Sequence, residues 1–541
     1  MSGEGEKIWN KYCSFLYEDF QKQIEYNEKK AEEYFKRLKN TRILETLGVK
    51  NARNIGQVPV TTYDDYPFLD VFGEEVKKLE AIIPKRKDET LAEYHIRIGG
   101  IAAESIKDYI PGEFEIYVKT SGTTSRSKWI IHTSLSREIT SEFGIACLAM
   151  ACSNRVGDTN LRFGDTGLNT CAPPPYISGW VYHYLNKIFK FKIYPPLEVT
   201  DRISDIRQRM LMVLNKMDTM KEHIAFIMST GSLLYMLVKY ITDRRSFYKD
   251  SFESLDIGIA KLYMFSKFIQ TKLLWEPKNV REVLPVKGLM CAGYDSKPYI
   301  ELFKSSFGVE PLNAYGSSEL VLLMYGTVEN RSNLIPDLRA GYIEFIDTES
   351  GDILKIDEVK EGKKYSLVAT YFGGCLVRYK IGDIFKVEDL RDDGMPIFSF
   401  EGREGYAIDL YGYFRIDEGL ALRVMMKAGF TPSEKWCFAK VIGPNEYVHV
   451  LMENEWGCTE EIATQKIFNA LLEESIDFRN FVRDFRIKNP SDIIKVEYLR
   501  KGAFIRYSNL RSKMGSPYGQ MKPPRIIPTQ KMEIFETLRG I

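Results

Sequence analysis

The feature that most constrains the fold of this chain is an alternation of short apolar runs with helical segments, which starts near Gly56. A helix between two successive strands returns the chain so that the strands lie parallel in one sheet. The alternation therefore predicts an α/β core. Its predicted strands are residues 114–119, 169–172, 190–194, 224–228, 288–291 and 311–314.

The pattern changes twice further along the chain. Residues 341–400 contain closely spaced β-rich segments separated by Asp, Glu and Gly, which predicts a mainly antiparallel region. Beyond Gly402 helical and strand patterns alternate again. We therefore expect a large N-terminal α/β domain with a β-rich subregion, residues 1–402, and a small α+β C-terminal domain, residues 403–541. The strands predicted for the β-rich subregion are 341–346, 365–371, 376–380 and 397–401.

Charge and composition exclude several classes of protein. Lys and Arg total 75 and Asp and Glu total 74, so a net charge of +1 gives no support to bulk binding of nucleic acid or anionic membrane. The eight cysteines form no CxxC pair and are interpreted as reduced thiols. The start of the chain lacks the apolar core of a signal peptide, and the apolar stretch 224–238 is too short to span a bilayer. These features predict a cytoplasmic protein.

The strongest local motif is Thr120-Ser-Gly-Thr-Thr-Ser-Arg-Ser-Lys128, which follows the predicted strand 114–119. Gly122 allows close approach of the backbone, the hydroxyl and N–H groups can hold phosphate oxygens, and Lys128 can neutralise their charge. The motif is not a Walker A loop, because GxxxxGK[ST] is absent. The alternative interpretation is a polar turn without a ligand.

A second motif, Asn313-Ala-Tyr-Gly-Ser-Ser-Glu319, follows the predicted strand 311–314. Tyr315 offers a flat face for a base, Ser318 a hydroxyl, and Glu319 a hard oxygen ligand for Mg²⁺. Alternatively, Glu319 only begins a helix, where the helix dipole favours a negative charge.

Two further motifs come later in the chain. In Arg378-Tyr-Lys-Ile-Gly-Asp383, an Asp after a Gly turn can accept hydrogen bonds from two vicinal hydroxyls such as those of ribose. In Glu401-Gly-Arg-Glu-Gly405, Arg403 can pair with a phosphate or ribose. The alternatives are a hairpin Asp and a surface Arg in an interdomain loop.

In this order the four motifs resemble the adenylate-forming superfamily, which includes acyl-CoA synthetases, firefly luciferase and adenylation domains. The superfamily pattern is Ser-Gly-Thr-Thr-Gly-x-Pro-Lys, then Tyr-Gly-x-Thr-Glu, a Gly-Asp and a Gly-Arg. Here Ser125 and Ser127 replace the usual Gly and Pro of the first motif.

The C-terminal sequence resembles the GH3 family of acyl-acid amido synthetases within that superfamily. The relevant residues are Gly502-Ala-Phe504 and Gln520-Met-Lys-Pro-Pro-Arg525, against a family pattern of Gly-Thr-Phe and Gln-x-Lys-x-Pro-Arg. Residues 58–66 and 367–370 also resemble GH3 segments. Two departures are Ala503 in place of Thr, and Gly412-Tyr-Phe414 in place of Gly-Glu-Lys.

The resemblance implies a set of nucleotide-binding residues, with ATP and Mg²⁺ as cofactors. Tyr315 stacks on adenine in the turn with Gly316, Ser318 binds the α-phosphate, Asp383 binds the ribose hydroxyls, and Arg403 binds the ribose or a phosphate. The residues implied to hold the ATP phosphates are Ser121, Gly122, Thr123, Thr124 and Lys128.

The resemblance also implies three catalytic residues and a domain motion. Glu319 holds Mg²⁺, Lys128 neutralises the phosphates, and Lys522 reaches the α-phosphate from the small domain. This domain then rotates about residues 402–405, so that a second nucleophile can attack the acyl-adenylate.

Three functions remain open from the sequence. The first is adenylation of a carboxylic acid followed by transfer to an amino acid amine, as in GH3 enzymes; the second is an acyl-CoA ligase of the phenylacetate–CoA type; the third is a non-catalytic nucleotide-binding regulator. The expected partners are small-molecule acids and amino acids or CoA, with no nucleic acid and no membrane. The predicted acyl pocket is lined by Tyr176, Ile177, Ser178, Trp180, Met228, Thr230 and Cys291.

Overall fold

The computed structural model gives the chain a mixed α/β fold divided into two compact units. The first unit contains residues 1–234 and 279–399, and the second contains 235–278 and 400–541. The structure describes residues 3–120, 128–170, 172–203, 212–213, 223–246, 248–249, 259–270, 277–292, 299–321, 323–411, 414–430, 435–441, 446–513 and 524–541.

A seven-stranded sheet forms the predicted α/β core of the first unit, in the order β4-β3-β5-β6-β7-β8-β9. The first five strands pair in parallel, as the alternation predicts, and β8 and β9 add an antiparallel edge. The strands are β3 (Thr166–Leu168), β4 (Lys192–Tyr194), β5 (Ile224–Thr230), β6 (Gly288–Ala292), β7 (Leu312–Tyr315), β8 (Met324–Tyr325) and β9 (Ile335–Pro336).

The strand β5 shows why this sheet forms. Its first six residues, Ile224 to Ser229, are all buried, which is typical of a strand covered on both faces by helices. The helices of this part are α6 (Ser134–Ala151), α7 (Ile177–Phe189), α8 (Leu197–Thr200) and α13 (Ile300–Phe307), and α10 (Gly231–Thr242) follows β5 into the second unit.

Two expected strands differ from the structure. The strand β3 is Thr166–Leu168, so it ends before the run predicted at 169–172 begins. The polar residues Asn169 and Thr170 follow it. The strand predicted at 114–119 is β1 (Phe114–Lys119), but it lies outside the parallel sheet. It pairs antiparallel with β2 (Trp129–Thr133) as a β-hairpin, because the residues between the two strands, 120–128, are too few for the crossover connection that a parallel pair needs. We call residues 120–128 the phosphate-loop motif, after the role predicted for them.

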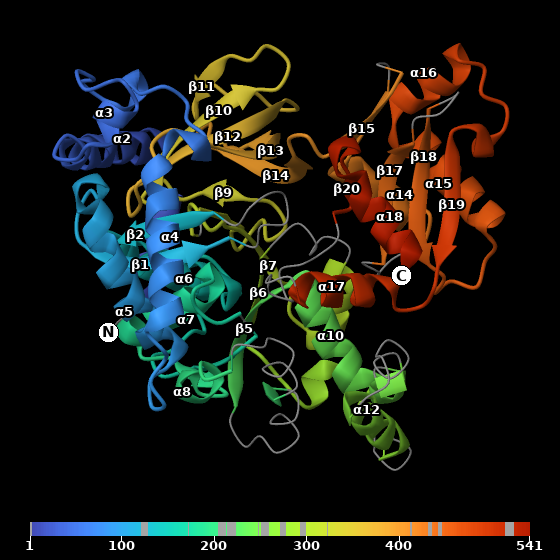
Figure 1. The fold of residues 1–541 in the computed structure, drawn as a ribbon, viewed down its shortest axis with the longest axis horizontal. Coiled ribbons are helices and arrows are strands. Elements are labelled where there is room, and N and C mark those ends of the chain that lie inside the picture. The colour runs from blue at the N-terminus through green and yellow to red at the C-terminus, as the bar shows by residue number, and fades with distance from the viewer. Residues whose placement is uncertain are drawn as a thin grey trace. The chain divides into compact units, whose positions relative to one another are not determined.

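The N-terminal segment is helical but interrupted. The continuous pattern at 5–47 becomes α1 (Glu4–Tyr12), α2 (Phe20–Leu38) and α3 (Ile43–Thr46), and the Asp19 side chain caps α2. Helices α4 (Pro67–Ile82) and α5 (Leu91–Ala103) follow and pack against the β1–β2 hairpin (Figure 1). One hydrophobic core joins these elements to residues 372–379.

The predicted β-rich subregion is a five-stranded antiparallel sheet in the order β11-β10-β12-β13-β14. Its strands are β10 (Gly341–Asp347), β11 (Ile353–Lys355), β12 (Lys364–Tyr371), β13 (Tyr379–Leu390) and β14 (Pro396–Arg403). The strand predicted at 376–380 lies largely before β13, which is longer and contains the polar motif up to Asp383.

The second unit is α+β in character. A four-stranded sheet has the order β19-β18-β17-β20, and β15 (Ala407–Leu410) pairs with β16 (Phe414–Asp417). Its strands are β17 (Trp436–Val441), β18 (Tyr447–Glu453), β19 (Ile494–Leu499) and β20 (Ile526–Ile527). Its helices are α12 (Ile259–Gln270), α14 (Glu418–Lys427), α15 (Glu460–Glu474), α16 (Ile476–Asp484), α17 (Ala503–Lys513) and α18 (Met532–Gly540).

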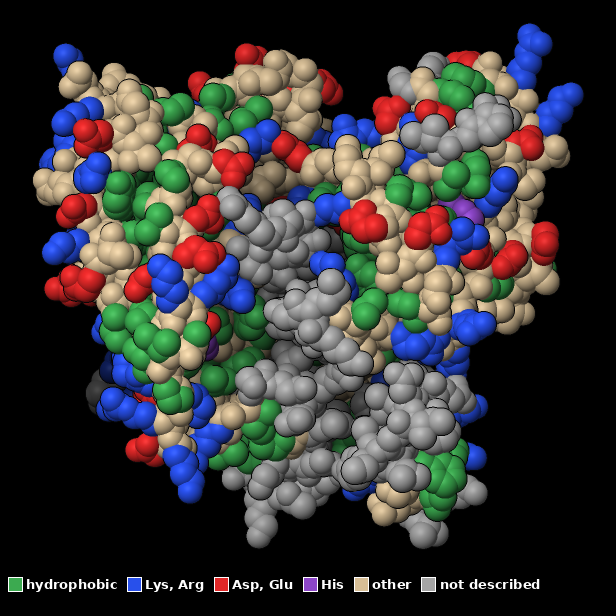
Figure 2. Space-filling view, in the orientation of Figure 1, with side chains coloured by type: hydrophobic (Ala, Val, Ile, Leu, Met, Phe, Trp, Pro, Cys, Tyr) green, Lys and Arg blue, Asp and Glu red, His purple; other side chains and the backbone are tan. Residues whose placement is uncertain are grey.

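Lys and Arg side chains are interspersed with Asp and Glu over the described surface in Figure 2, with no single-sign face in that view. None of the helices in the described part of the chain is both long and apolar enough to cross a membrane.

Candidate active site

The carboxyl ends of β5, β6 and β7 meet at one edge of the seven-stranded sheet. Thr230 pairs with Ala292, and Ala292 pairs with Ala314, so the three strands end side by side. In open parallel sheets, ligands bind outside this edge. The motif residues Gly316 to Glu319 leave β7 at this point.

The turn after β7 is held by local hydrogen bonds. The Ser317 Oγ accepts a hydrogen bond from the Leu320 amide at 3.2 Å, and the Ser317 carbonyl accepts from the Val321 amide at 2.8 Å. Val321 has φ 62°, in the left-handed region that a β-branched residue rarely adopts. Such strain persists only where the surroundings enforce it, and it is concentrated at functional sites.

His132 on β2 ties this turn to the strand that follows the phosphate-loop motif. Its Nε2 donates to the Ser318 carbonyl at 3.0 Å, and its Nδ1 has no partner among the described residues. The ring is fully buried, and burial lowers the pKa of His132 to about 4. The imidazole is therefore neutral at physiological pH, with its proton on Nε2.

Tyr315 and Asp383 meet across the two sheets of the first unit. The Tyr315 hydroxyl donates to Asp383 Oδ2 at 2.7 Å, and both side chains are buried. The Tyr315 ring also packs edge-on against Phe385, with centroids 4.8 Å apart. The structure thus joins the predicted adenine-binding and ribose-binding residues, whose roles toward a nucleotide stay predictions.

A bulge in β13 directs Asp383 to this position. Ser366 of β12 pairs with Ile384, whereas Val368 pairs with Lys380, so β13 has two extra residues in this interval. Gly382 supplies the positive φ of 84° within the bulge. Bulges are common next to active sites because they redirect a side chain out of the ordinary strand alternation.

Lys128 lies just before β2, and its side chain reaches the start of β13. Its Nζ donates to the Tyr379 hydroxyl at 3.0 Å, and its amide donates to Thr120 Oγ1 at 2.9 Å.

Together these contacts form a closed circuit. Lys128 contacts Tyr379 on β13, Asp383 on the same strand contacts Tyr315 on β7, and Ser318 after β7 contacts His132 on β2. The circuit and the turn after β7 bring together six of the predicted site residues, namely Lys128, Tyr315, Gly316, Ser318, Glu319 and Asp383.

The other predicted site residues are placed differently. Ser121, Gly122, Thr123, Thr124 and Lys522 lie outside the described residues. Arg403 ends β14 in the second unit, where its carbonyl accepts from the Tyr406 amide at 3.1 Å. Burial raises the pKa of Tyr406 to about 12, and the Arg403 charge partly opposes this shift.

Glu319 fits the role of a Mg²⁺ ligand that shares the ion with a nucleotide. Its half-buried carboxylate has no hydrogen bond or ion pair among the described residues, so its oxygens are available. No cluster of three or more His, Cys, Asp or Glu forms a metal cage in that same part of the chain. Mg²⁺ commonly binds one or two carboxylates together with substrate phosphates, so a single Glu suits that use.

The residues predicted for the acyl pocket are less informative. The Trp180 side chain is fully buried and its indole N–H donates to the Tyr117 carbonyl at 3.1 Å, so it is part of the core. Thr230 and Cys291 lie at the strand ends described above. The pocket itself stays a prediction.

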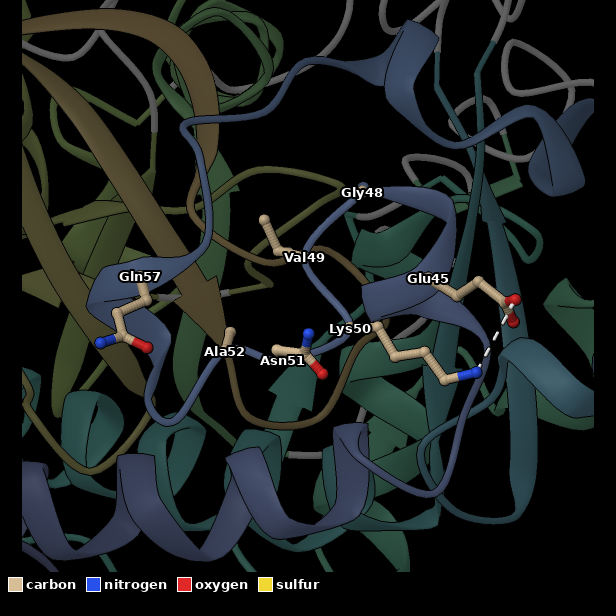
Figure 3. Close-up of a pocket in the computed structure, with 7 residues that line it drawn as sticks. All are labelled: Glu45, Gly48, Val49, Lys50, Asn51, Ala52 and Gln57. Carbon is tan, nitrogen blue, oxygen red and sulfur yellow. Dashed lines mark ion pairs between the residues drawn. The ribbon is translucent and has the colours of Figure 1, made fainter.

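A surface hollow elsewhere in the first unit does not have the character of an active site. It is lined by Glu45, Gly48, Val49, Lys50, Asn51, Ala52 and Gln57 (Figure 3). All of these residues come from one stretch of chain, and the pair Glu45–Lys50 is exposed, with 3.9 Å between charged atoms. A catalytic site normally needs polar groups that converge from several elements.

Sequence reasoning missed His132, Tyr379 and Tyr63 as site residues. His132 is the one ionisable side chain in the apolar strand Trp-Ile-Ile-His-Thr, which is a signal that could have been used. Tyr379 and Tyr63 stand inside segments already noted for their resemblance, but no local pattern shows that each contacts Lys128.

Comparisons with known proteins relate part of the chain to a known family and the whole fold to solved structures. Residues 334–403 match the family model for the GH3 family central domain. The fold is similar to that of the AtGH3.15 acyl acid amido synthetase in complex with 2,4-DB, with a TM-score of 0.67 at 16% identity over 100% of this chain and 97% of that one. A second structure of a GH3.15 acyl acid amido synthetase gives a TM-score of 0.62 at 17% identity over 95% and 92% of the chains.

A more distant similarity is to a 2-hydroxyisobutyryl-CoA ligase in the postadenylation state with 2-HIB-AMP. The TM-score is 0.52 at 12% identity over 96% of this chain and 91% of that one. A comparison with curated protein sequences finds no match. At these identities the structural likeness establishes the fold.

Proposed function

We propose that this chain is a GH3-like enzyme, which uses ATP to activate a carboxylic acid and transfers the acyl group to the amine of an amino acid. The match of residues 334–403 to the GH3 central domain and the similarity of the fold to acyl acid amido synthetases support this general class of reaction. The circuit of contacts that joins three motifs from distant parts of the chain supports it most directly.

In the first half-reaction a carboxylate oxygen attacks the α-phosphorus of ATP, and pyrophosphate leaves. Negative charge builds on the phosphates, so positive groups and donors fixed at that place lower the barrier. Lys128 supplies a fixed positive charge, and the hydroxyl of Ser318, in the turn after β7, supplies a hydrogen-bond donor.

Mg²⁺ held by Glu319 together with the nucleotide would supply further neutralisation of the phosphate charge. We assign to Asp383 the acceptance of hydrogen bonds from the ribose hydroxyls, and to Tyr315, whose hydroxyl donates to Asp383, the contact with the base. These assignments extend the geometry of the first unit to a bound nucleotide.

In the second half-reaction the neutral amine of an amino acid attacks the carbonyl carbon of the acyl-adenylate. An amide bond forms, the bond between the carbonyl carbon and the phosphate oxygen breaks, AMP leaves, and the proton lost by the amine passes to solvent. We assign to Lys522 and Arg403 the roles implied by their motifs, and to residues 403–541 the rotation that separates the two half-reactions.

An acyl-CoA ligase is the second candidate function. The similarity to 2-hydroxyisobutyryl-CoA ligase over nearly the whole chain favours it, because the first half-reaction is the same and only the acceptor differs. The similarity to the GH3.15 structures is greater, which supports an amine as the first candidate acceptor. A nucleotide-binding regulator without catalysis is the third.

The test is exchange of labelled pyrophosphate into ATP with a panel of carboxylic acids in the presence of Mg²⁺. We expect exchange with at least one acid, and AMP release with that acid to require a free amino acid. AMP release that requires CoA instead supports the acyl-CoA ligase. A protein that binds ATP but exchanges no pyrophosphate with any acid is the regulator, and the proposed activity is then wrong.

A matched pair of variants tests the metal role within the same assay. Glu319→Gln replaces a carboxylate by an amide, a poorer ligand for a hard cation, so we expect a loss of exchange that is greatest at low Mg²⁺ and partly recovered at high Mg²⁺. Glu301→Gln, on the exposed face of α13, is the control and leaves the Mg²⁺ dependence unchanged. A loss in Glu319→Gln that is equal at all Mg²⁺ concentrations contradicts the metal role.

A further inference from the structure

Two tyrosines from distant parts of the chain surround the Lys128 ammonium group. The Tyr379 hydroxyl accepts its hydrogen bond at 3.0 Å. The Nζ atom also lies 5.5 Å from the centroid of the Tyr63 ring and 5.7 Å from that of the Tyr379 ring. Both distances are within the range of a cation–π interaction.

Tyr63 also holds the backbone next to Lys128. Its hydroxyl accepts a hydrogen bond from the Trp129 amide at 3.0 Å, so the main chain leaving the phosphate-loop motif is fixed at the residue after the lysine. The Tyr63 side chain is buried and cannot move aside freely.

Tyr379 is fixed by its strand and by the N-terminal segment. It pairs with Ala369 of β12 and forms a parallel bridge with Thr61. The Thr61 amide donates to the Arg378 carbonyl at 2.9 Å, and the Lys380 amide donates to the Thr61 carbonyl at 2.9 Å. The two tyrosines therefore belong to segments that are hydrogen-bonded to each other.

A buried ion pair also stabilises the start of β13, just before Tyr379. Arg378 Nε and Glu344 Oε2 are 2.6 Å apart, and both side chains are buried. The Arg378 guanidinium also donates to the Gly56 carbonyl at 3.1 Å. These contacts hold the start of β13 against the chain that leads to Tyr63.

We call the site that Tyr63 and Tyr379 form around the Lys128 ammonium group the seat. Its chemistry suits a lysine that binds an anion. An ammonium has three donors, and the Tyr379 hydroxyl uses one of them. A phenol hydroxyl and two aromatic rings are neutral, so they orient the ammonium without cancelling its charge. No carboxylate lies within ion-pairing distance of Lys128 in the described part of the chain, and a carboxylate there would compete with the phosphates.

We propose that Tyr63 and Tyr379 are positioning residues that hold the Lys128 ammonium ready for the phosphates of the nucleotide. This inference rests on the proposed function, because it takes the phosphates of ATP as the ligand of Lys128. A free lysine has four flexible carbons to order on binding, and the seat orders them beforehand.

A double-mutant cycle tests the inference. Tyr379→Phe removes the hydroxyl and keeps the ring, and we expect it to raise the KM for ATP in pyrophosphate exchange roughly 3- to 10-fold, the range for one lost hydrogen bond. In a Lys128→Ala background the same change has no further effect, because the hydroxyl has no ammonium to hold. An equal effect in both backgrounds overturns the proposal.

Tyr365→Phe is the matched control. Tyr365 is a buried tyrosine of β12 in the same sheet, and its hydroxyl accepts from the Lys360 amide at 2.9 Å. This variant loses a buried hydroxyl bond without touching Lys128, so its KM for ATP stays at the wild-type value. Tyr63→Phe, which frees the Trp129 amide, is the second test variant if Tyr379→Phe does not fold.

A second measurement separates failure of the seat from failure of the proposed function. Labelling of Lys128 by an amine-directed reagent, followed by mass spectrometry without nucleotide, reports how firmly the ammonium is held. We expect at least roughly twofold faster labelling in Tyr379→Phe than in wild type or Tyr365→Phe, since one of the bonds that hold the ammonium is lost.

Each outcome of the labelling experiment has a definite meaning. Unchanged labelling overturns the inference even if the protein binds ATP. Faster labelling with an additive cycle also overturns it, because the seat then does not serve the nucleotide. Faster labelling in a protein without ATP binding refutes the proposed function and leaves the seat established.

Discussion

The two sheets of the first unit present their site residues in different ways. The parallel sheet presents Ser318 and Glu319 in a turn that follows the end of β7. The antiparallel sheet presents Tyr379 and Asp383 from within one strand, at its first residue and at a bulge. The first arrangement depends on a turn, and the second depends on the register of a whole strand.

Because of this difference, mutations in the turn after β7 and mutations in β13 should have different effects on the protein. A turn after a strand end can change conformation while the strand stays in place. A strand that slips by one residue moves all of its side chains to the opposite face. Damage to β13 should therefore affect stability and several site residues together, whereas damage to the turn should stay local.

The largest expected effect is at Arg378, which anchors the start of β13. Arg378→Met leaves Glu344 buried without its partner, which should cost about 3–5 kcal/mol in the free energy of unfolding, measured by urea denaturation. The double variant Arg378→Met with Glu344→Met removes both charges and should recover much of that loss. Lys363→Met, from an exposed ion pair between Lys363, just before β12, and Glu349, in the turn after β10, is the control and should change stability little. A small loss in Arg378→Met contradicts the role of the ion pair.

The second prediction concerns pH and the turn after β7. In the folded protein the pKa of His132 is lowered to about 4, whereas an unfolded histidine titrates near 6.5. Between these values the unfolded state binds more protons, so this contribution to stability is complete above pH 6.5 and is lost as the pH falls toward 4. The loss should reach about 3 kcal/mol.

His132→Gln provides the comparison for that prediction. The variant lacks the titrating ring, and all other carboxylates and histidines are common to both proteins. The difference in unfolding free energy between wild type and variant should therefore shrink or reverse as the pH falls from about 6.5 to about 4. A difference that is constant with pH would show that His132 does not stay neutral in the fold.

The next largest effect is expected at Asp383 in β13, and it concerns the affinity for ATP. Asp383→Asn removes the negative charge and keeps an oxygen that can accept from the Tyr315 hydroxyl. We expect the affinity for ATP to fall by about 1.5–3 kcal/mol, as for a hydrogen bond to a charged group, with little change in melting temperature. Asp389→Asn, exposed at the far end of β13, should leave ATP binding unchanged. Calorimetric titration with ATP measures both.

The smallest expected effect is at the bulge itself. Gly382→Ala forces a side chain into a positive φ of 84°, which should cost about 1–2 kcal/mol of stability and also raise the KM for ATP. Gly394→Ala carries a similar strain at φ 89°, in the turn between β13 and β14, and should lose similar stability with no change in KM. Equal KM values in the two variants would mean that the bulge does not direct Asp383.

The sequence predicts most strands of both sheets, and the exceptions have physical reasons. Buried parallel strands such as β5 are continuous apolar runs, which are visible without knowledge of their neighbours. In β13 the polar residues and the two-residue bulge interrupt the period-two pattern, so the sequence pattern predicts this strand too early in the chain. The two-residue strands β8 and β9 are too short to leave a pattern.

The same reasoning explains which site residues could be predicted. Tyr315, Ser318, Glu319 and Asp383 stand in compact motifs, so local sequence suffices to find them. The contacts between the motifs cannot be found in this way, because Tyr315 and Asp383 are 68 residues apart, and Lys128 and Tyr379 are 251 residues apart. Hydrogen bonds over such separations are set by the fold of the whole unit, which no local pattern contains.

The bridge between Thr61 and the start of β13 has a consequence for the order of events during protein synthesis. The Thr61 hydroxyl donates to the Val377 carbonyl, 316 residues further along the chain. Domains begin to fold while the ribosome still adds residues at their C-terminal side. A nascent chain stalled before residue 377 thus contains the complete phosphate-loop motif but has no second tyrosine to receive its lysine. Nucleotide binding should accordingly appear late in translation, after β13 has emerged.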